Sequence, residues 1–332
     1  MSTYRAYRKA RTSLALALVV AMGLLVSSCS SATNTSQANL KLVGNFYPIT
    51  WLVERIAGDA ADVTSLTPNG VEPHDLQLDA KSVALIQEAN LVFYLGLEFQ
   101  PEVEKAISQL ADTSKAIDLL KSPGVTLLDV KEEEDGHDHE EGEDHDHEGE
   151  KDVEHKHPLA GGKDPHVWLD PANMTLMAKA ISSELKKIAP DFTETFESNF
   201  SALEGELNGL DNDISSQLAN CEIKTVVTSH AAFLYFTEKY GFEQLAIAGI
   251  SPEDEPDAKR LAGIADSAKD AKVTTVYFEE VLSPALAKTV AQEVGAELSF
   301  LSALEFVPES GDYISQMRSN LQNLFVGQGC SK

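Results

Sequence analysis

A proline-free helical pattern from Asp191 to Asn220 is the feature that most constrains how this chain can fold. At about 1.5 Å per residue, a helix of thirty residues would span roughly 45 Å. Apolar side chains mark one face of it: Phe192, Phe196, Phe200, Leu203, Leu207, Leu210, Ile214 and Leu218. Such a helix is long enough to serve as a spine between two lobes.

Strand and helix patterns alternate on both sides of this spine. Before it we predict elements at Leu40–Gly44, Ile49–Gly58, Asp62–Leu66, Lys81–Ala89, Leu91–Leu95 and Pro101–Leu110. After it we predict elements at Ile223–Thr228, Ala231–Tyr240, Gln244–Ile250, Ala258–Ala268, Val273–Phe278, Ser283–Val294, Glu297–Leu301 and Asp312–Phe325. The alternation is typical of α/β domains with parallel sheets. The chain is therefore predicted to form α/β lobes at 40–170 and 221–332, joined by a helical connection at 171–220.

A low-complexity segment at 131–157 interrupts the first lobe. It holds fourteen acidic residues and six of the nine histidines, which are His137, His139, His145, His147, His155 and His157. It carries almost no apolar side chains whose burial could offset the entropy of ordering, so we predict that 131–160 is disordered. Alternating imidazoles and carboxylates suit a divalent transition metal. We interpret the segment as an accessory metal loop, with a solvated acidic linker as the alternative.

The N-terminus reads as an export signal. A basic stretch precedes an apolar run at 13–26, which is too short and wrongly flanked for a transmembrane helix. Val26-Ser27-Ser28-Cys29 resembles a bacterial lipobox, in which the cysteine is lipidated. We predict a signal peptide at 1–28, a lipid anchor on Cys29 and a tether at 29–39, which gives an exported protein of the periplasm or cell surface. Plain secretion with cleavage near the same point is the alternative.

Charge and the remaining cysteines narrow the possibilities further. The formal net charge of −27 disfavours nucleic-acid binding, which requires a basic surface. Two cysteines remain after Cys29, namely Cys221 and Cys330. In an exported protein they suggest one disulfide, although both could be free.

The three histidines outside the His-rich segment are His74, His166 and His230. Each follows a predicted strand or lies in a loop that leads into a helix, and ligands of open α/β sheets collect at the carboxyl ends of strands. Three imidazoles that converge there would form a nitrogen-rich site suited to zinc, with room for a fourth ligand. Any one of these histidines alone would more often be structural.

Four stretches carry a resemblance to a known family. They read GVEPHDLQ (70–77), DPHVWLDPANM (164–174), SHAAFLYFTEKYG (229–241) and VYFEEVLSPALAKTVAQEVGAEL (276–298). Together they resemble the metal-binding solute-binding proteins of bacterial ABC importers, of the zinc-uptake (ZnuA-like) type. The resemblance implies two lobes bridged by a rigid long helix, with the metal in the cleft between them. It also implies that His74 and His166 come from the first lobe and His230 from the second.

The resemblance favours zinc and leaves the fourth ligand open. Manganese-binding members often have a carboxylate where this chain has His230, and carboxylate oxygen suits Mn²⁺ better than imidazole does. Many relatives carry an Asp-Pro-Leu segment whose aspartate is a ligand, but the matching stretch here reads Ser302-Ala303-Leu304. We expect water or Glu72 in the fourth position. The side chains expected to line the cleft or orient the imidazoles are Asp75, Asp164, Glu279 and Glu280. Those expected to pack around the site are Trp168, Phe233 and Tyr235.

The function expected from this resemblance is transport. The chain would be a monomeric, non-enzymatic zinc-binding component that delivers Zn²⁺ to an ABC importer permease. One alternative is import of Mn²⁺ or Fe²⁺, and another is an exported zinc metalloenzyme, although the chain lacks the HExxH motif. An adhesin role, described for relatives of this fold, would be an addition to transport.

Overall fold

The computed structural model describes residues 40–130, 162–254, 256–279 and 284–331. The predicted signal peptide, Cys29, the tether, Glu280 and the six clustered histidines lie outside these residues. Within the described ranges, no helix combines the length and the hydrophobicity that a membrane crossing requires.

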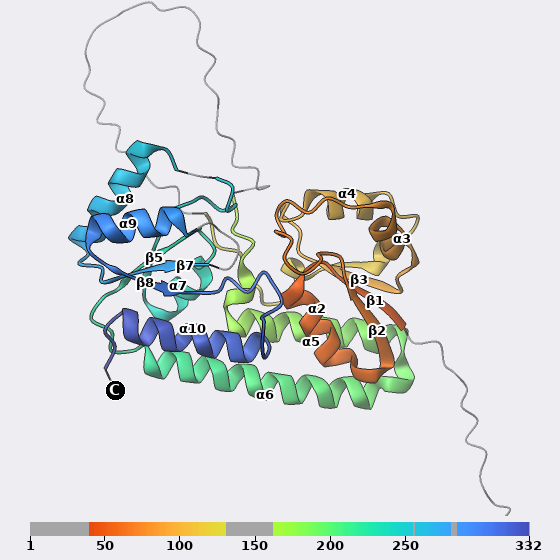
Figure 1. Ribbon diagram of the computed structural model, residues 1–332. Coiled ribbons are helices and arrows are strands. Elements are labelled where there is room, and N and C mark those ends of the chain that lie inside the picture. The colour runs from red at the N-terminus through yellow and green to blue at the C-terminus, as the bar shows by residue number, and fades with distance from the viewer. Residues whose placement is uncertain (1–39, 131–161, 255, 280–283, 332) are drawn as a thin grey trace, which may run out of the picture. The chain divides into compact units, whose positions relative to one another are not determined.

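The N-terminal lobe is built on a parallel sheet in the order β2-β1-β3-β4 (Figure 1). Its strands are β1 (Leu40–Gly44), β2 (Ala61–Ser65), β3 (Leu91–Tyr94) and β4 (Ala116–Asp118). Its helices are α2 (Tyr47–Ala57), α3 (Ala80–Glu88) and α4 (Pro101–Ser108), with 3-10 turns at η1 (Gly58–Ala60), η2 (Thr113–Lys115) and η3 (Leu119–Lys121). The side chain of Asp79 caps α3 by accepting a hydrogen bond from the Ser82 amide.

The C-terminal lobe repeats this topology with a parallel sheet in the order β6-β5-β7-β8. Its strands are β5 (Thr225–Thr228), β6 (Glu243–Ala246), β7 (Thr275–Phe278) and β8 (Glu297–Phe300). Its helices are α7 (Leu234–Tyr240), α8 (Ala258–Asp270), α9 (Ala285–Val294) and α10 (Tyr313–Gly327). The α/β fold with two parallel sheets is therefore confirmed.

Helices connect the two lobes, in the order η4 (Val167–Leu169), α5 (Pro171–Ile188), η5 (Pro190–Phe192) and α6 (Thr193–Gln217). The 25 residues of α6 span about 38 Å. The prediction of thirty residues was too long, because the apolar face begins in the η5 turn at Phe192 and extends past the helix end to Leu218.

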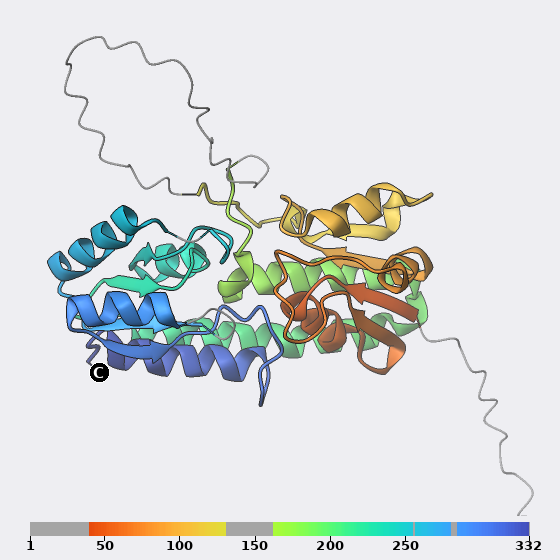
Figure 2. The ribbon, with the colours of Figure 1, turned by 45° about the horizontal axis from the view of Figure 1, so that its top comes forward.

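The long helix α6 packs against α5, against α2 of the N-terminal lobe and against α10 of the C-terminal lobe (Figure 2). The buried side chains on its face are Phe196, Leu203, Leu207, Leu210 and Ile214. They belong to one apolar cluster that includes Leu52 of α2 and Leu324 of α10. The spine role predicted for this helix therefore rests on a core that is shared by both lobes.

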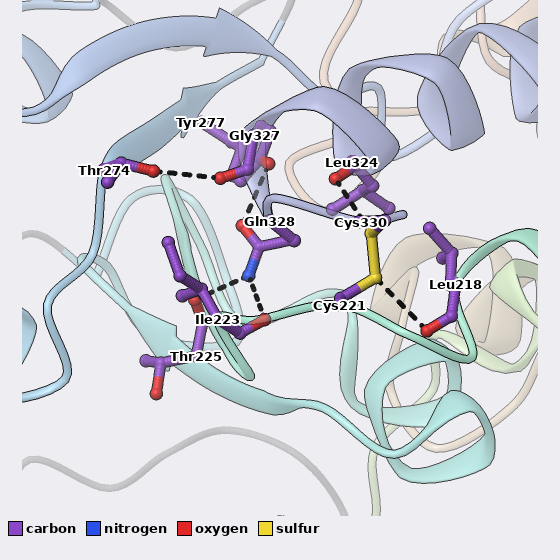
Figure 3. The surroundings of a disulfide bond; sticks show 10 residues. All are labelled: Leu218, Cys221, Ile223, Thr225, Thr274, Tyr277, Leu324, Gly327, Gln328 and Cys330. Carbon is purple, nitrogen blue, oxygen red and sulfur yellow. Dashed lines mark hydrogen bonds between the residues drawn. A yellow bond between two sulfur atoms is a disulfide. The ribbon is translucent and has the colours of Figure 1, made fainter. Parts of the chain in front are cut away.

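The end of the chain is fastened to the C-terminal lobe (Figure 3). A disulfide joins Cys221, just after α6, to Cys330, just after α10, which is the pairing that the sequence suggests. Next to it the side chain of Gln328 donates hydrogen bonds to the carbonyls of Ile223 and Thr225 and accepts one from the Tyr277 hydroxyl. These bonds hold the ends of α6 and α10 against strands β5 and β7.

Candidate metal centre

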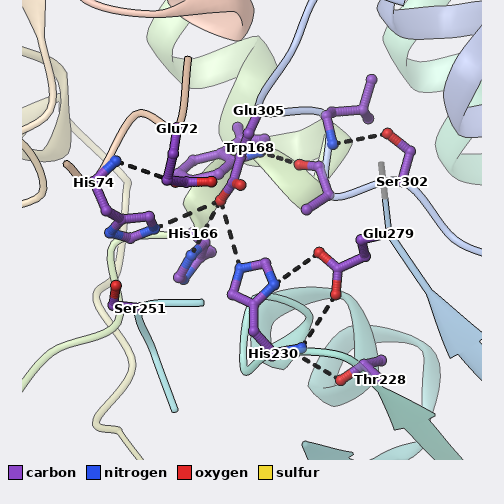
Figure 4. A network of polar contacts seen from close by, with 12 residues as sticks. Glu72, His74, His166, Trp168, Thr228, His230, Ser251, Glu279, Ser302 and Glu305 are labelled. Atoms are coloured by element: carbon purple, nitrogen blue, oxygen red, sulfur yellow. Dashed lines mark hydrogen bonds and ion pairs between the residues drawn. The ribbon is translucent and has the colours of Figure 1, made fainter. Parts of the chain in front are cut away.

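Four side chains from separate parts of the chain converge at one point (Figure 4). They are His74 after β2, His166 before η4, His230 after β5 and Glu305 after β8. One ligand atom of each lies within 4.8 Å of the other three. The structure therefore brings together the three histidines that the sequence singles out, and adds a carboxylate. Three of the four follow strand ends, where ligands of open α/β sheets bind.

The Nε2 atoms of the three histidines face one oxygen of Glu305. The Oε1 atom of Glu305 lies 3.6 Å from Nε2 of His74, 3.7 Å from Nε2 of His166 and 3.5 Å from Nε2 of His230. These four atoms are buried and have no hydrogen-bond partner among the described residues. Unpaired buried polar atoms cost free energy. A cation at their centre would pair all four, so the arrangement fits a four-coordinate metal.

Glu305 corrects the expectation that this position lacks a carboxylate. It comes one residue after the Ser302-Ala303-Leu304 stretch that was matched to the family's Asp-Pro-Leu. Leu304 adopts a left-handed backbone conformation with φ of 60°, which is uncommon for a side chain of its type. The turn brings the next side chain into the site. A signal was present in the sequence, because Glu305 is the only charged residue between Phe300 and Pro308.

Hydrogen bonds hold the turn that presents Glu305. The Leu304 amide donates to the Ser302 hydroxyl, and the Trp168 indole donates to the Ala303 carbonyl at 2.7 Å. The side chain of Asn320 on α10 accepts a hydrogen bond from the Ser302 amide and donates one to the Ser302 carbonyl. The turn is therefore fixed from two directions, and so is the position of the carboxylate.

Glu72, the residue expected as a protein ligand in the fourth position, lies beside the group and is not one of the four converging side chains. Its carboxylate accepts a hydrogen bond from the amide of His74 at 3.2 Å. Burial and the charge of Glu305 raise the pKa of Glu72 to about 8. Its place outside the four converging side chains, together with its hydrogen bond to the His74 amide, makes Glu72 a neighbour of the site.

Two buried carboxylates orient two of the imidazoles. The Oδ1 atom of Asp164 lies 2.8 Å from Nδ1 of His166, and Oε2 of Glu279 lies 2.7 Å from Nδ1 of His230. Each carboxylate also accepts a hydrogen bond from the backbone amide of its histidine. An imidazole that donates from Nδ1 leaves Nε2 free to bind a metal. Asp164 and Glu279 therefore lie where orienting groups are expected from the sequence, whereas Asp75 is exposed.

His74 is held in another way. Its ring packs edge-on against Phe99, with ring centroids 4.6 Å apart. The side chain of Gln100 donates hydrogen bonds to the Pro73 carbonyl and to the Thr67 hydroxyl, which steadies the loop around the histidine. Among the described residues, no carboxylate is hydrogen-bonded to Nδ1 of His74.

The site carries opposite charges before any metal arrives. Burial lowers the pKa of His230, but the carboxylates of Glu279 and Glu305 outweigh burial and raise that pKa well above its ordinary value. Burial raises the pKa of Glu305, but His230 and His74 outweigh it and hold that pKa far below its usual range. Burial lowers the pKa of His74. The metal-free site therefore holds a protonated His230 beside an ionised Glu305, and a bound metal ion must displace that proton.

Comparison with known proteins identifies the family. The family model described as "ZnuA: Zinc-uptake complex component A periplasmic" matches residues 43–326. The chain belongs to the ZnuA family. It is 37% identical over 314 residues to the zinc-binding lipoprotein AdcA of Streptococcus pneumoniae and 35% identical over 322 residues to the high-affinity zinc uptake system protein ZnuA of Bacillus subtilis. The resemblance inferred from the four sequence motifs is confirmed.

Coverage differs between these members of the ZnuA family. The alignment with AdcA covers 91% of this chain but only 59% of AdcA, whereas that with the Bacillus protein covers 93% and 95%. A solved structure of the Zn(II)-bound ZnuA-like domain of Streptococcus pneumoniae AdcA superposes with a TM-score of 0.69 at 33% identity. It covers 88% of this chain and 99% of that domain. The two-lobed fold is therefore that of the ZnuA family.

Proposed function

We propose that this chain captures Zn²⁺ with His74, His166, His230 and Glu305 and delivers it to the permease of an ABC importer. The observation that carries the proposal is the set of four buried ligand atoms that face one another without hydrogen-bond partners among the described residues. Membership of the ZnuA family supports it, as do the relatives, which are described as zinc-binding or zinc-uptake proteins.

The donor set favours zinc over manganese or iron. Three imidazole nitrogens and one carboxylate oxygen match the four-coordinate geometry common for Zn²⁺. Mn²⁺ prefers a site richer in oxygen ligands and water. The two carboxylates behind His166 and His230 direct both Nε2 atoms toward the centre of the site, where a transition metal would bind them after displacing the proton of His230.

The same donor set favours capture over catalysis. A catalytic zinc keeps one position open for water or substrate, whereas four protein ligands would close the coordination shell. We therefore regard the exported metalloenzyme as the weaker alternative. Protons displaced from the site would couple zinc uptake to pH.

The location and the accessory loop rest on residues outside the described ranges. The lipobox-like sequence before Cys29 supports an exported, lipid-anchored protein, and AdcA of Streptococcus pneumoniae is described as a lipoprotein. We propose that the six histidines between His137 and His157 bind zinc weakly and serve the tight site as an accessory.

Metal titration tests the proposal. Protein purified without added metal and titrated with Zn²⁺ should show one tight site that Mn²⁺ does not displace. Glu305→Gln should weaken that site by about 100-fold, since zinc binding at four-ligand sites is worth about 10–16 kcal/mol in all. Glu72→Gln is the matched control and should leave the affinity nearly unchanged. Preferential binding of Mn²⁺, or equal losses in the two variants, would overturn the assignment.

Deletion of Asp135–His157 tests the accessory role in the same titration. The tight site should persist and several weak sites should disappear. Loss of the tight site on deletion would mean that the His-rich segment supplies ligands to it.

A further inference from the structure

The segment that carries His166 is bonded on both sides to helix α7 of the C-terminal lobe. On one side, the Tyr235 hydroxyl donates a hydrogen bond to the Asp164 carbonyl at 2.8 Å and accepts one from the Leu128 amide at 3.0 Å. On the other side, Nζ of Lys239 lies 2.5 Å from Oδ1 of Asp170, the residue that caps α5. His166 lies between these two attachment points.

Tyr235 and Lys239 belong to one face of α7, because residues four apart on a helix are neighbours. The helix begins four residues after His230, so the element that carries both attachment groups directly follows the loop that carries the second ligand. That loop is itself fixed, since Gln244 donates a hydrogen bond to the His230 carbonyl. The two ligand segments are therefore connected through a short and rigid path.

Asp164 joins this path to the imidazole. Its carboxylate orients the ring of His166, and its carbonyl accepts the Tyr235 hydrogen bond. Tyr235 is 4% exposed, and burial raises the pKa of its hydroxyl, so the group stays protonated and can donate. The ring centroids of His166 and His230 lie 5.4 Å apart. A shift of Asp164 would change that separation directly.

Lys239 adds a second attachment in a partly buried position. Its ammonium also lies 2.8 Å from Oδ1 of Asp211 on α6, so it joins the start of α5 to the long helix. The Tyr313 hydroxyl of α10 donates a further hydrogen bond to the Trp168 carbonyl, two residues after His166. The segment from Asp164 to Asp170 is thus hydrogen-bonded to the C-terminal lobe. It also contacts the N-terminal lobe, because the Asp164 amide donates to the Leu128 carbonyl and Trp168 packs against Phe99. The sequence resemblance assigns His166 to the first lobe, and these contacts place its segment against both lobes.

We propose that Tyr235 and Lys239 of α7 are positioning residues for zinc binding, which fix His166 at the separation from His230 that the ion requires. The inference deepens the proposed function and rests on it. Neither residue touches the metal. Each acts through the backbone or cap of the His166 segment, as outer groups of metal sites commonly act through the ligands that they orient.

The test compares two tyrosine variants of the full-length chain. Tyr235→Phe removes only the hydroxyl at the His166 segment, and Tyr277→Phe removes the buried hydroxyl that donates to Gln328 in the same lobe. We expect zinc to dissociate about 10–100 times faster from Tyr235→Phe, the range found for outer-group changes. Tyr277→Phe should keep the native zinc dissociation rate, even where both variants lose similar thermal stability.

Two further measurements separate positioning from general destabilisation. The visible absorption of bound Co²⁺ reports ligand geometry and should change in Tyr235→Phe but not in Tyr277→Phe. Lys239→Met should also speed zinc release, whereas Lys269→Met, which breaks a surface pair with Glu293, should not. Lys239→Met carries the test if Tyr235→Phe fails to fold.

The outcomes distinguish this inference from the function on which it rests. If His230→Ala loses tight zinc binding while Tyr235→Phe and Lys239→Met release zinc at the native rate, the positioning role is wrong and the site stands. If His230→Ala binds zinc as tightly as the native chain, the site assignment itself is wrong.

Discussion

The two lobes share one sheet topology but hold their zinc-facing histidines differently. Carboxylates contact the Nδ1 atoms of His230 and of His166, whose segment is hydrogen-bonded to α7, and α10 fixes the turn that presents Glu305. We call these three ligands the C-terminal side of the site. On the N-terminal side, His74 packs against Phe99, and Gln100 steadies its loop through backbone contacts. Three of the four proposed ligands are thus held by polar contacts, whereas His74 is held mainly by packing.

This difference indicates that the two groups of proposed ligands have different roles in zinc binding. The three proposed ligands on the C-terminal side already have the geometry for a metal before the ion binds, which lowers the cost of ordering them. The N-terminal lobe supplies the ligand whose ring is least constrained by polar contacts. We expect the C-terminal side to determine affinity, and His74 to complete the shell.

The largest expected effect concerns the stability of the C-terminal lobe. The Cys221→Ser/Cys330→Ser double variant removes a disulfide that closes a loop of 109 residues, and should lower the free energy of unfolding by about 2–5 kcal/mol. Denaturant unfolding of the metal-free protein measures it. An unchanged denaturant midpoint would show that the disulfide does not stabilise the C-terminal lobe.

The ligands themselves give the next largest effect. Zinc binding worth about 10–16 kcal/mol over four ligands averages about 2.5–4 kcal/mol for each, or roughly 70- to 1000-fold in affinity. His230→Ala should fall near the upper value, because it also removes the imidazole that pairs with both Glu279 and Glu305. His74→Ala should fall near the lower value. Competition titrations with a zinc chelator compare the two, and a greater loss in His74→Ala would reverse the proposed roles.

Changes to the groups that orient the histidines should also reduce zinc affinity more at His230 than at His74. Glu279→Gln weakens the hold on His230 and should cost about 10–100-fold in zinc affinity. Gln100→Leu disturbs only the loop around His74 and should cost less than about tenfold. The same chelator competition measures both variants. Equal losses would show that the two lobes hold their ligands equally firmly.

The most gradual expected effect is the pH dependence of zinc binding. The raised pKa of His230 means that the metal-free site carries a proton at neutral pH, and zinc must displace it. Affinity should therefore rise with pH, by about tenfold per unit for one proton, until pH exceeds the pKa of His230. Calorimetry in buffers of different ionisation enthalpy counts the released protons.

Glu279→Gln sharpens this pH prediction. Removal of one of the two carboxylates that raise the pKa of His230 should lower that pKa and reduce the number of protons released at neutral pH. An unchanged proton count in this variant would show that Glu279 does not control the protonation of His230.

Much of the fold was accessible from the sequence because periodicity and motif order are local signals. The α/β alternation and the spine helix both follow from patterns within a few residues. The ends of α6 were misjudged, because Phe192 and Leu218 continue the apolar face outside the helix. Residues just outside the helix are buried in the same core as the apolar face of the helix. The apolar pattern alone therefore does not show where the helix ends.

The site was less accessible, because its completion depends on a turn. Matching Ser302-Ala303-Leu304 to the family's Asp-Pro-Leu stretch indicated that the carboxylate is missing. In the structure, Leu304 has a left-handed backbone conformation, and the next residue, Glu305, supplies the carboxylate. The attachment of His166 to the C-terminal lobe was also hidden. It depends on the Tyr235 hydroxyl, which joins residues 71 positions apart.

Zinc K-edge X-ray absorption of the full-length protein loaded with one equivalent of Zn²⁺ tests the central claim most directly. The account predicts a four-coordinate shell of three imidazole nitrogens at about 2.0–2.1 Å and one carboxylate oxygen at about 2.0–2.2 Å. The oxygen contribution should change in Glu305→Gln and persist in Glu72→Gln. A shell with fewer than three imidazoles, or one that is unaltered in Glu305→Gln, would contradict it.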